Sequence, residues 1–274
     1  MHEIGTKGLF TAEIERALAG GSIDLAVHSL KDLPTGPTPG ISTLAIPRRE
    51  DPRDVLVVRE GLCVEGNATG SLAGARIGTS SLRRTAQIRR RFPEARAVPL
   101  RGNVETRIGR LAPGGLDAAV LAVAGLRRLG LRPAGTVALD PPEWLPAPGQ
   151  GALAIQGRVG DGRVARFAAL IDDETTRAAV SAERAFLAGL EGGCHAPIAA
   201  LAIVRGKTLE LRGALYPVDD SEPPISATEE GDPGLAVEIG KRLAERFVAA
   251  GGRRVIEAWA SAGGSHPLGP HSEV

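Results

Sequence analysis

Residues 81–123 read SLRRTAQIRRRFPEARAVPLRGNVETRIGRLAPGGLDAAVLAV. Strand-like and helical patterns alternate along this stretch and just before it, with apolar runs at 55–58, 97–100 and 117–123 and helix candidates at 81–92 and 103–111. Short strands that alternate with helices predict an α/β domain with a largely parallel sheet. Ligands of such domains gather at the carboxyl ends of the strands, close to helix amino termini, where Ser80 and Ser81 are candidate N-caps.

The same region is strongly basic. Between Arg76 and Arg110, ten arginines stand against Glu94 and Glu105, a local balance of +8 in a chain whose net charge is +1. We therefore expect an anionic ligand there, and guanidinium groups suit carboxylates. A nucleic-acid surface is the rival interpretation, but binders of single strands use aromatic stacking platforms and this region offers only Phe92. An acidic small molecule is favoured, with no nucleic-acid partner.

On either side of this domain the pattern changes. The segment GLFTAEIERALAGG predicts an amphipathic helix at 8–19, and the apolar run at 23–27 predicts a strand that Asp32 should follow on a loop. Downstream, 152–157 resembles one more strand. The carboxyl region reads as α+β, with helices at 174–190 and 235–250, strands near 198–206, 208–216 and 225–229, and a loose tail after about 261.

Length and composition narrow the class of protein. At 274 residues the chain suits two or three domains, and its 43% hydrophobic and 24% charged residues are ordinary for globular proteins. No apolar run approaches the roughly 20 residues of a membrane-spanning helix, so we expect a cytoplasmic protein without a membrane partner. Cys63 and Cys194 show neither a disulfide framework nor zinc-like spacing, so no metal is expected.

Two short motifs carry residues suited to chemistry. Asp32 lies beside Lys31 and near His28, although an aspartate before Leu-Pro is more often a turn former. Cys194 follows two glycines that allow a close approach of the backbone, although a free cysteine is more often a small buried thiol. Cys63 has no such setting. Either residue taken alone is weak evidence for a site.

The pieces occur together, in order, in one enzyme family. The segments are KGLFTAEIERAL, DLAVHSLKDLP, REDPRDVLV, IGTSSLRR, LRGNVETR, LAVAGLRRLG, PAPGQGALAI and EGGCHAPI, which cover most of Lys7 to Ile198. In this respect the chain resembles porphobilinogen deaminase, also called hydroxymethylbilane synthase. The probability that eight segments agree in order by chance is very small. The joint match therefore favours functional roles for Asp32 and Cys194 over the interpretations as a turn former and a buried thiol.

The resemblance implies a fold and a domain division. Two α/β lobes similar to periplasmic binding proteins would surround a cleft, and a smaller α+β C-terminal domain would carry a cofactor. The implied domains are residues 1–50 with 150–170, residues 51–149, and residues 171–274. The family begins with a further strand, helix and strand, so the first lobe is expected to be incomplete here and the activity of the chain as written is expected to be doubtful.

The resemblance also implies a reaction and a cofactor. The enzyme is a transferase of tetrapyrrole and haem biosynthesis that deaminates four porphobilinogen molecules and joins them head to tail into hydroxymethylbilane. A dipyrromethane cofactor would be attached covalently at Cys194, since a thiolate is a strong nucleophile. The implied protein is a monomer with porphobilinogen as its small-molecule partner.

Individual roles follow from matching positions. Asp32 and the adjacent Lys31 match the catalytic residues. The residues implied for cofactor binding besides Cys194 are Arg83, Arg84, Arg101, Arg107 and Ser81, and those implied for substrate binding are Arg128 and Gln150. The alternative hypothesis is a non-catalytic two-lobed protein that binds a small carboxylate. Such a protein would need the arginines but neither Asp32 nor Cys194.

Overall fold

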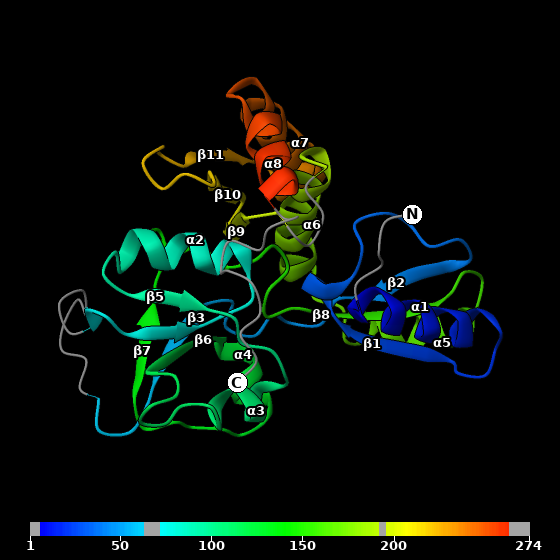
Figure 1. Ribbon diagram of the computed structural model, residues 1–274. Coiled ribbons are helices and arrows are strands. Elements are labelled where there is room, and N and C mark those ends of the chain that lie inside the picture. Colours follow the sequence, from blue (N-terminus) through cyan, green and yellow to red (C-terminus); the bar gives the residue numbers. More distant parts are fainter. Residues whose placement is uncertain (1–5, 63–71, 192–195, 263–274) are drawn as a thin grey trace.

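The computed structural model describes residues 6–62, 72–191 and 196–262. Its strands form three separate sheets, and the helices pack on their faces (Figure 1). The architecture is α/β, with two lobes side by side and a smaller α+β domain at the C-terminal end of the described chain.

The first sheet has the strand order β1-β8-β2, and both pairs are antiparallel. Its strands are β1 (Leu25–Ser29), β2 (Ile41–Ala45) and β8 (Leu153–Arg158), and its helices are α1 (Thr6–Ala19) and α5 (Gly162–Ala169). One apolar cluster joins Leu18 of α1 to Ala26 and Ile41, and another joins Ala168 of α5 to Ala45 and Ile155. The two helices therefore contact the sheet through different clusters. The strand predicted at 23–27 begins two residues later, at Leu25.

The second sheet has the order β5-β4-β6-β3-β7. Its strands are β3 (Asp54–Val58), β4 (Arg76–Gly78), β5 (Arg96–Val98), β6 (Ala118–Ala122) and β7 (Thr136–Leu139), and its helices are α2 (Leu82–Arg91), α3 (Val104–Ile108) and α4 (Val123–Arg128). Every residue of β3 is buried. Leu56 packs in one cluster with Ile88 of α2, and Val55 packs in another with Leu126 of α4, so helices cover both faces. This explains the unbroken apolar run at 55–58.

The expectation of a largely parallel sheet is wrong for half of the strand pairs, because two of the four pairs are antiparallel. β4 pairs in parallel with both β5 and β6, whereas β3 is antiparallel to β6 and to β7. β3 enters the lobe directly from β2 of the first sheet, with no helix between these two strands.

The C-terminal domain is an antiparallel sheet covered by helices. Its strands, in the order β11-β10-β9, are β9 (Ile198–Arg205), β10 (Thr208–Leu215) and β11 (Ile225–Gly231); its helices are α6 (Glu174–Gly189), α7 (Ala236–Ala249) and α8 (Gly252–Ala262). Phe186 and Phe247 meet edge to face in its core with centroids 4.8 Å apart. The tail expected after about 261 falls almost wholly outside the described residues.

The C-terminal domain packs against both lobes. Leu201 and Tyr216 share an apolar cluster with Ala86 of α2, whereas Val180 of α6 belongs to the cluster of Leu30 and Ala154 in the first lobe. The strands of residues 1–50 with 150–170, of 51–149 and of 171–274 each form one sheet. We keep the boundaries themselves as a proposal, because α6 contributes to two cores.

Two crossing segments join the lobes, one running from the end of β2 to β3 and the other from the end of β7 to β8. They lie against each other, since Glu50 N–H donates to the carbonyl of Gly151. Gly151 has φ of +86°, and a Cβ there would lie 2.4 Å from the Glu50 carbonyl oxygen. The glycine is needed both for its left-handed backbone and for this close approach.

Candidate functional site

Asp32 and Lys31 lie in a single 3-10 turn, η1 (Leu30–Asp32), that follows β1 directly. The predicted position of Asp32 after a strand is therefore confirmed. Leu30 is 2% exposed and anchors the turn in the core of the first lobe, while Lys31 and Asp32 are half-buried. An apolar anchor next to two ionisable groups keeps those groups at a defined place on the lobe.

Arg184 of α6 holds the backbone on both sides of Asp32. Its guanidinium donates to the carbonyls of Leu30 (3.4 Å) and Leu33 (3.2 Å), and also to that of Pro34. The helix that leads toward residue 194 thus supports the turn that carries Asp32. No pattern in the sequence connected these two segments.

Asp54 is the centre of a buried polar cluster in the second lobe. This carboxylate is 0% exposed and is the first residue of β3. Arg83 Nη1 donates to Asp54 Oδ2 at 2.8 Å, and Arg84 Nη2 donates to Asp54 Oδ1 at 2.7 Å. Both arginines also donate to backbone carbonyls, of Leu145 and Val120 respectively. The two guanidinium groups are thereby fixed between α2 and the sheet.

Gln150 and Trp144 complete the cluster and extend it to the first lobe. Trp144 Nε1 donates to Asp54 Oδ2 at 2.9 Å, and Gln150 Nε2 donates to Asp54 Oδ1 at 2.8 Å. The Gln150 amide oxygen accepts a hydrogen bond from Lys31 Nζ at 3.4 Å. A continuous polar chain therefore runs from the arginines of α2, through a crossing segment, to the turn of Asp32.

The charges at this place are mainly positive. Burial, together with the charges of Arg84 and Arg83, lowers the pKa of Lys31 to about 8, while the charges of Asp32 and Asp54 act in the opposite direction. Burial and the charge of Arg84 also lower the pKa of Arg107. Burial by itself would raise the pKa of Asp54, but the guanidinium groups of Arg83 and Arg84 outweigh this effect and hold the pKa well below its ordinary value. Four cations here face two carboxylates, which suits an anionic ligand.

The other predicted residues lie around this cluster. Ser81 caps α2 and accepts from Arg84 N–H at 3.4 Å. Arg107 Nε donates to the carbonyl of Gly102, and Arg101 is exposed. Arg128 Nη2 donates to the carbonyl of Gly151 at 2.6 Å, so this residue contacts the crossing segment. Lys31, Arg83, Arg84, Gln150 and Arg107 are the predicted residues that the structure brings together with Asp32.

The predicted cofactor residue, Cys194, lies outside the described residues, as does Cys63. The helix α6 ends at Gly189, and Glu191 has a φ of +53°. The described chain resumes at Ala196, just before β9. The attachment at Cys194 therefore stays a prediction.

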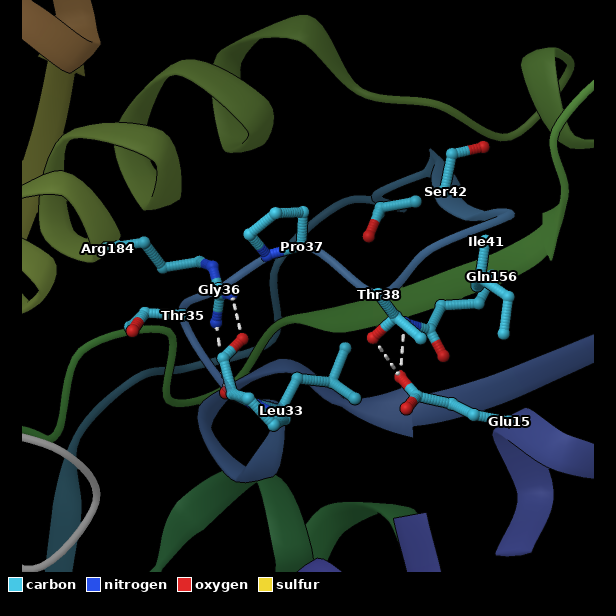
Figure 2. A pocket seen from close by; sticks show the side chains of 12 residues that line it. Glu15, Leu33, Thr35, Gly36, Pro37, Thr38, Ile41, Ser42, Gln156 and Arg184 are labelled. Carbon is cyan, nitrogen blue, oxygen red and sulfur yellow. Dashed lines mark hydrogen bonds between the residues drawn. The ribbon is translucent and has the colours of Figure 1, made fainter. Parts of the chain in front are cut away.

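A cavity of about 390 Å³ lies beside the turn of Asp32 (Figure 2). Glu15, Thr38 and Gln156 line one part of it, and Thr38 Oγ1 and Gln156 Nε2 both donate to Glu15 Oε1. Arg184 lines another part, where it reaches the carbonyls of the loop. None of the predicted site residues that the structure describes lines this cavity, so we place the functional site at the cation cluster instead.

Comparison with known proteins decides the family. Residues 1–166 match the family described as porphobilinogen deaminase, dipyromethane cofactor binding domain, and residues 177–249 match the porphobilinogen deaminase C-terminal domain. The chain belongs to the porphobilinogen deaminase family.

Relatives of the porphobilinogen deaminase family cover most of the chain. The porphobilinogen deaminase of Roseiflexus castenholzii is 44% identical over 257 residues, which are 93% of this chain and 82% of that protein. That of Nocardia farcinica is 48% identical over 259 residues, 91% of this chain and 73% of that protein. Among solved structures, the periplasmic VFT2 domain of Bordetella pertussis BvgS is 20% identical over 57% of this chain and 63% of that chain, with a TM-score of 0.34. At that score the similarity adds nothing to the fold described above.

The residues of this family member fit the cofactor that the family description names. A dipyrromethane carries carboxylate side chains, and the cluster holds more cations than anions. The Nε atoms of Arg83 and Arg84 are buried and, in the described part of the chain, have no hydrogen-bond partner. Each could still donate to a carboxylate. These two atoms, with Arg107 and Lys31, are the groups suited to hold such a ligand.

Sequence reasoning missed Asp54, Arg49 and Glu183. Arg49 donates through Nη1 and Nη2 to Glu183, whose side chain is 0% exposed. The available signals were weak: Asp54 stands at the head of an otherwise apolar strand, and Glu183 stands on the apolar face of its helix. A charge at a position where the periodicity requires burial predicts an ion pair, without identifying its partner.

Proposed function

We propose that this chain catalyses the reaction for which its relatives are named, the deamination of porphobilinogen and the joining of four such units into hydroxymethylbilane. The observation that supports it most is the convergence of Lys31, Asp32, Arg84 and Arg107 where the two lobes meet, in a chain that matches the family over most of its length. In each addition, the bond between the substrate's methylene carbon and its amino group breaks and ammonia leaves. A carbon–carbon bond then forms to a free pyrrole α-carbon, which loses its proton. Release of the four-unit chain is a hydrolysis that consumes one water molecule: the hydroxyl becomes the hydroxymethyl group of the product, and the proton goes to the pyrrole α-carbon from which the chain is cleaved.

Asp32 is proposed as the catalytic carboxylate. Loss of ammonia leaves positive charge on the pyrrole and methylene group, and a carboxylate held in place beside that charge stabilises it without reorganisation. Asp32 is also suited to accept the proton that leaves the α-carbon. The support of this turn by Arg184 keeps the carboxylate in one position as the substrate reacts.

The cations are proposed to bind the acidic side chains. Arg83, Arg84, Arg101 and Arg107, with Ser81, would hold the cofactor, and Arg128 and Gln150 would contact the substrate. Lys31 would neutralise a carboxylate and handle protons beside Asp32. If bound through Cys194, a dipyrromethane would supply the first free pyrrole α-carbon and would keep the growing chain attached to the protein.

We further propose that the protein acts as a monomer in the cytoplasm. The residues of the site come from the two lobes of one chain, so a second copy is not required to complete it. A chain with two cysteines, one of them needed as a thiolate, suits a reducing compartment. In the ranges 6–62, 72–191 and 196–262, no helix is long and apolar enough to cross a membrane.

Intact-mass spectrometry tests the proposal directly. Protein supplied with porphobilinogen should gain the mass of two pyrrole units and react with Ehrlich's reagent, and Cys194→Ser should do neither. Asp32→Asn should keep the pyrrole units if they load, and should lower kcat by about 100-fold or more, the usual cost of losing a preorganised charge.

Two results would contradict the proposal. An unmodified Cys194 thiol in folded protein that has been supplied with porphobilinogen would exclude the covalent cofactor. Tight binding of a small carboxylate without any consumption of porphobilinogen would favour the rival interpretation, a non-catalytic binding protein.

A further inference from the structure

Asp54 is a buried carboxylate that the proposed reaction does not use. Its four donors come from two parts of the chain: α2 supplies Arg83 and Arg84, and the crossing segment between β7 and β8 supplies Trp144 and Gln150. Asp54 lies in the second lobe, whereas Lys31, at the other end of the same polar chain, lies in the first. The connection between them depends on one amide, that of Gln150.

The orientation of the Gln150 amide is determined by Asp54. Gln150 Nε2 donates to the carbonyl of Pro52 at 2.7 Å and to Asp54 Oδ1 at 2.8 Å. Both of these groups can only accept, so the amide oxygen cannot take that place. It must face the other way, where Lys31 Nζ donates to it at 3.4 Å. Removing the carboxylate removes one of the two acceptors that fix this orientation.

The charge of Asp54 also affects Lys31, because it favours the protonated form of the amine. Lys31 faces two cations, Arg83 and Arg84, and two carboxylates, Asp32 and Asp54. Asp54 lies between the guanidinium groups and accepts from both. Without its charge, two uncompensated arginines would remain near the amine, and the protonated form of Lys31 would be disfavoured.

We propose that Asp54 is a positioning residue for Lys31: through the Gln150 amide it holds the Lys31 amine beside Asp32, and its charge keeps that amine protonated at neutral pH. A protonated Lys31 can form an ion pair with a carboxylate of the substrate or donate a proton, whereas a neutral amine has no charge for the ion pair and no acidic proton to give. The inference rests on the proposed function, because Lys31 has a role in catalysis only if the chain is a deaminase. Its test does not use turnover.

The chain is suited to a direct measurement, because it has only four lysines, Lys7, Lys31, Lys207 and Lys241. Trace acetylation with acetic anhydride across pH 6–11, followed by mass spectrometry of the peptides, reports the unprotonated fraction of each amine. Lys207 and Lys241 are exposed and serve as internal references. In the unsubstituted protein, the Lys31 midpoint is expected at about 8.

Asp54→Asn should lower the Lys31 midpoint by about one pH unit, a usual effect of one nearby charge, and so raise its labelling at pH 7 about fivefold. Gln150→Leu keeps the Asp54 charge but removes the acceptor, so its shift should have the same sign and be smaller. Asp117→Asn is the matched control: Asp117 pairs with Arg59 in the same lobe and does not face Lys31. It should leave the midpoint unchanged.

Circular dichroism and melting curves identify which variants fold. An unchanged Lys31 midpoint in folded Asp54→Asn overturns the proposal; if that variant does not fold, an unchanged midpoint in folded Gln150→Leu does so. A shift in either, with none in Asp117→Asn, supports it. Because labelling needs no substrate, a protein without deaminase activity that still shows the shift would refute the proposed function and leave the positioning of Lys31 supported.

Discussion

Glu183 of α6 ties the two crossing segments to the C-terminal domain. Its buried carboxylate accepts from Arg49 Nη1 and Nη2, at 2.7 and 3.0 Å, from Gly149 N–H at 2.6 Å and from Ala202 N–H at 2.7 Å. Arg49 and Gly149 lie on the two crossing segments, and Ala202 lies on β9. We predict that Glu183→Gln strongly lowers the free energy of unfolding.

The magnitude follows from these contacts. Glutamine has nearly the same shape but a single acceptor oxygen, so two of the four donors lose their partner and face an NH₂ group instead. Arg49, whose side chain is 11% exposed, also loses its counter-ion. Breaking a buried ion pair by removing one partner costs about 3–5 kcal/mol. For a chain of this size each kcal/mol corresponds to roughly 2–4 °C, so Tm should fall by roughly 6–20 °C.

Urea unfolding and thermal melting at pH 7 measure the effect. Arg49→Met removes the other partner, and in the double variant the second substitution should cost less than it does alone, which gives the coupling energy of the pair. Glu222→Gln is the control, because Glu222 pairs with Arg254 at the surface, where the side chains are 47% and 77% exposed. Such a pair contributes less than about 1 kcal/mol.

Equal losses of stability for Glu183→Gln and Glu222→Gln would refute this reasoning. So would simple additivity of the Glu183 and Arg49 substitutions, since it would mean that the buried pair contributes no more than two independent side chains.

Three further predictions concern other contacts. Gly151→Ala places a Cβ 2.4 Å from the Glu50 carbonyl oxygen and should lower the free energy of unfolding by at least about 2 kcal/mol. Gly114 also has a positive φ, +77°, but nothing lies within 4 Å of a Cβ there, so Gly114→Ala should cost only about 1 kcal/mol. Equal losses in urea unfolding would show that the crossing segments separate easily. Tyr216→Phe removes an O–H that donates to Gln87 Oε1 at 3.0 Å and should cost about 1 kcal/mol in the same assay, with no change at all arguing against that hydrogen bond. The folded-state pKa of Lys31, about 8, lies below the unfolded value of roughly 10.4, so the unfolded chain binds more protons between these two pH values. The free energy of unfolding should therefore rise as pH increases through that window. Lys31→Met should remove this rise and Lys207→Met should not, and the same slope in both variants would contradict the assignment.

Much of the local structure could be predicted from residue patterns. The apolar run at 55–58 lies in β3 and the helix candidate at 81–92 contains α2, because periodicity and N-caps act over a few residues. The turn of Asp32 after a strand was predictable for the same reason. Elements with weak patterns were not predicted: β4 has three residues, and α5 exposes Phe167 at 68%.

The sequence by itself determined the family, the local elements and the identity of the candidate residues, since each of these depends on residue types and short spacings. Only the tertiary structure decided how those residues are used. Arg83 and Arg84 read as free ligand-binding cations, yet each donates to Asp54, which lies 29 and 30 positions away. Likewise Lys31 meets Gln150 across 119 positions. A pattern of burial shows that a charged side chain must find a partner, but the partner is chosen only when distant segments close on each other and water leaves, because the energy of the pair depends on the distance and burial that closure creates.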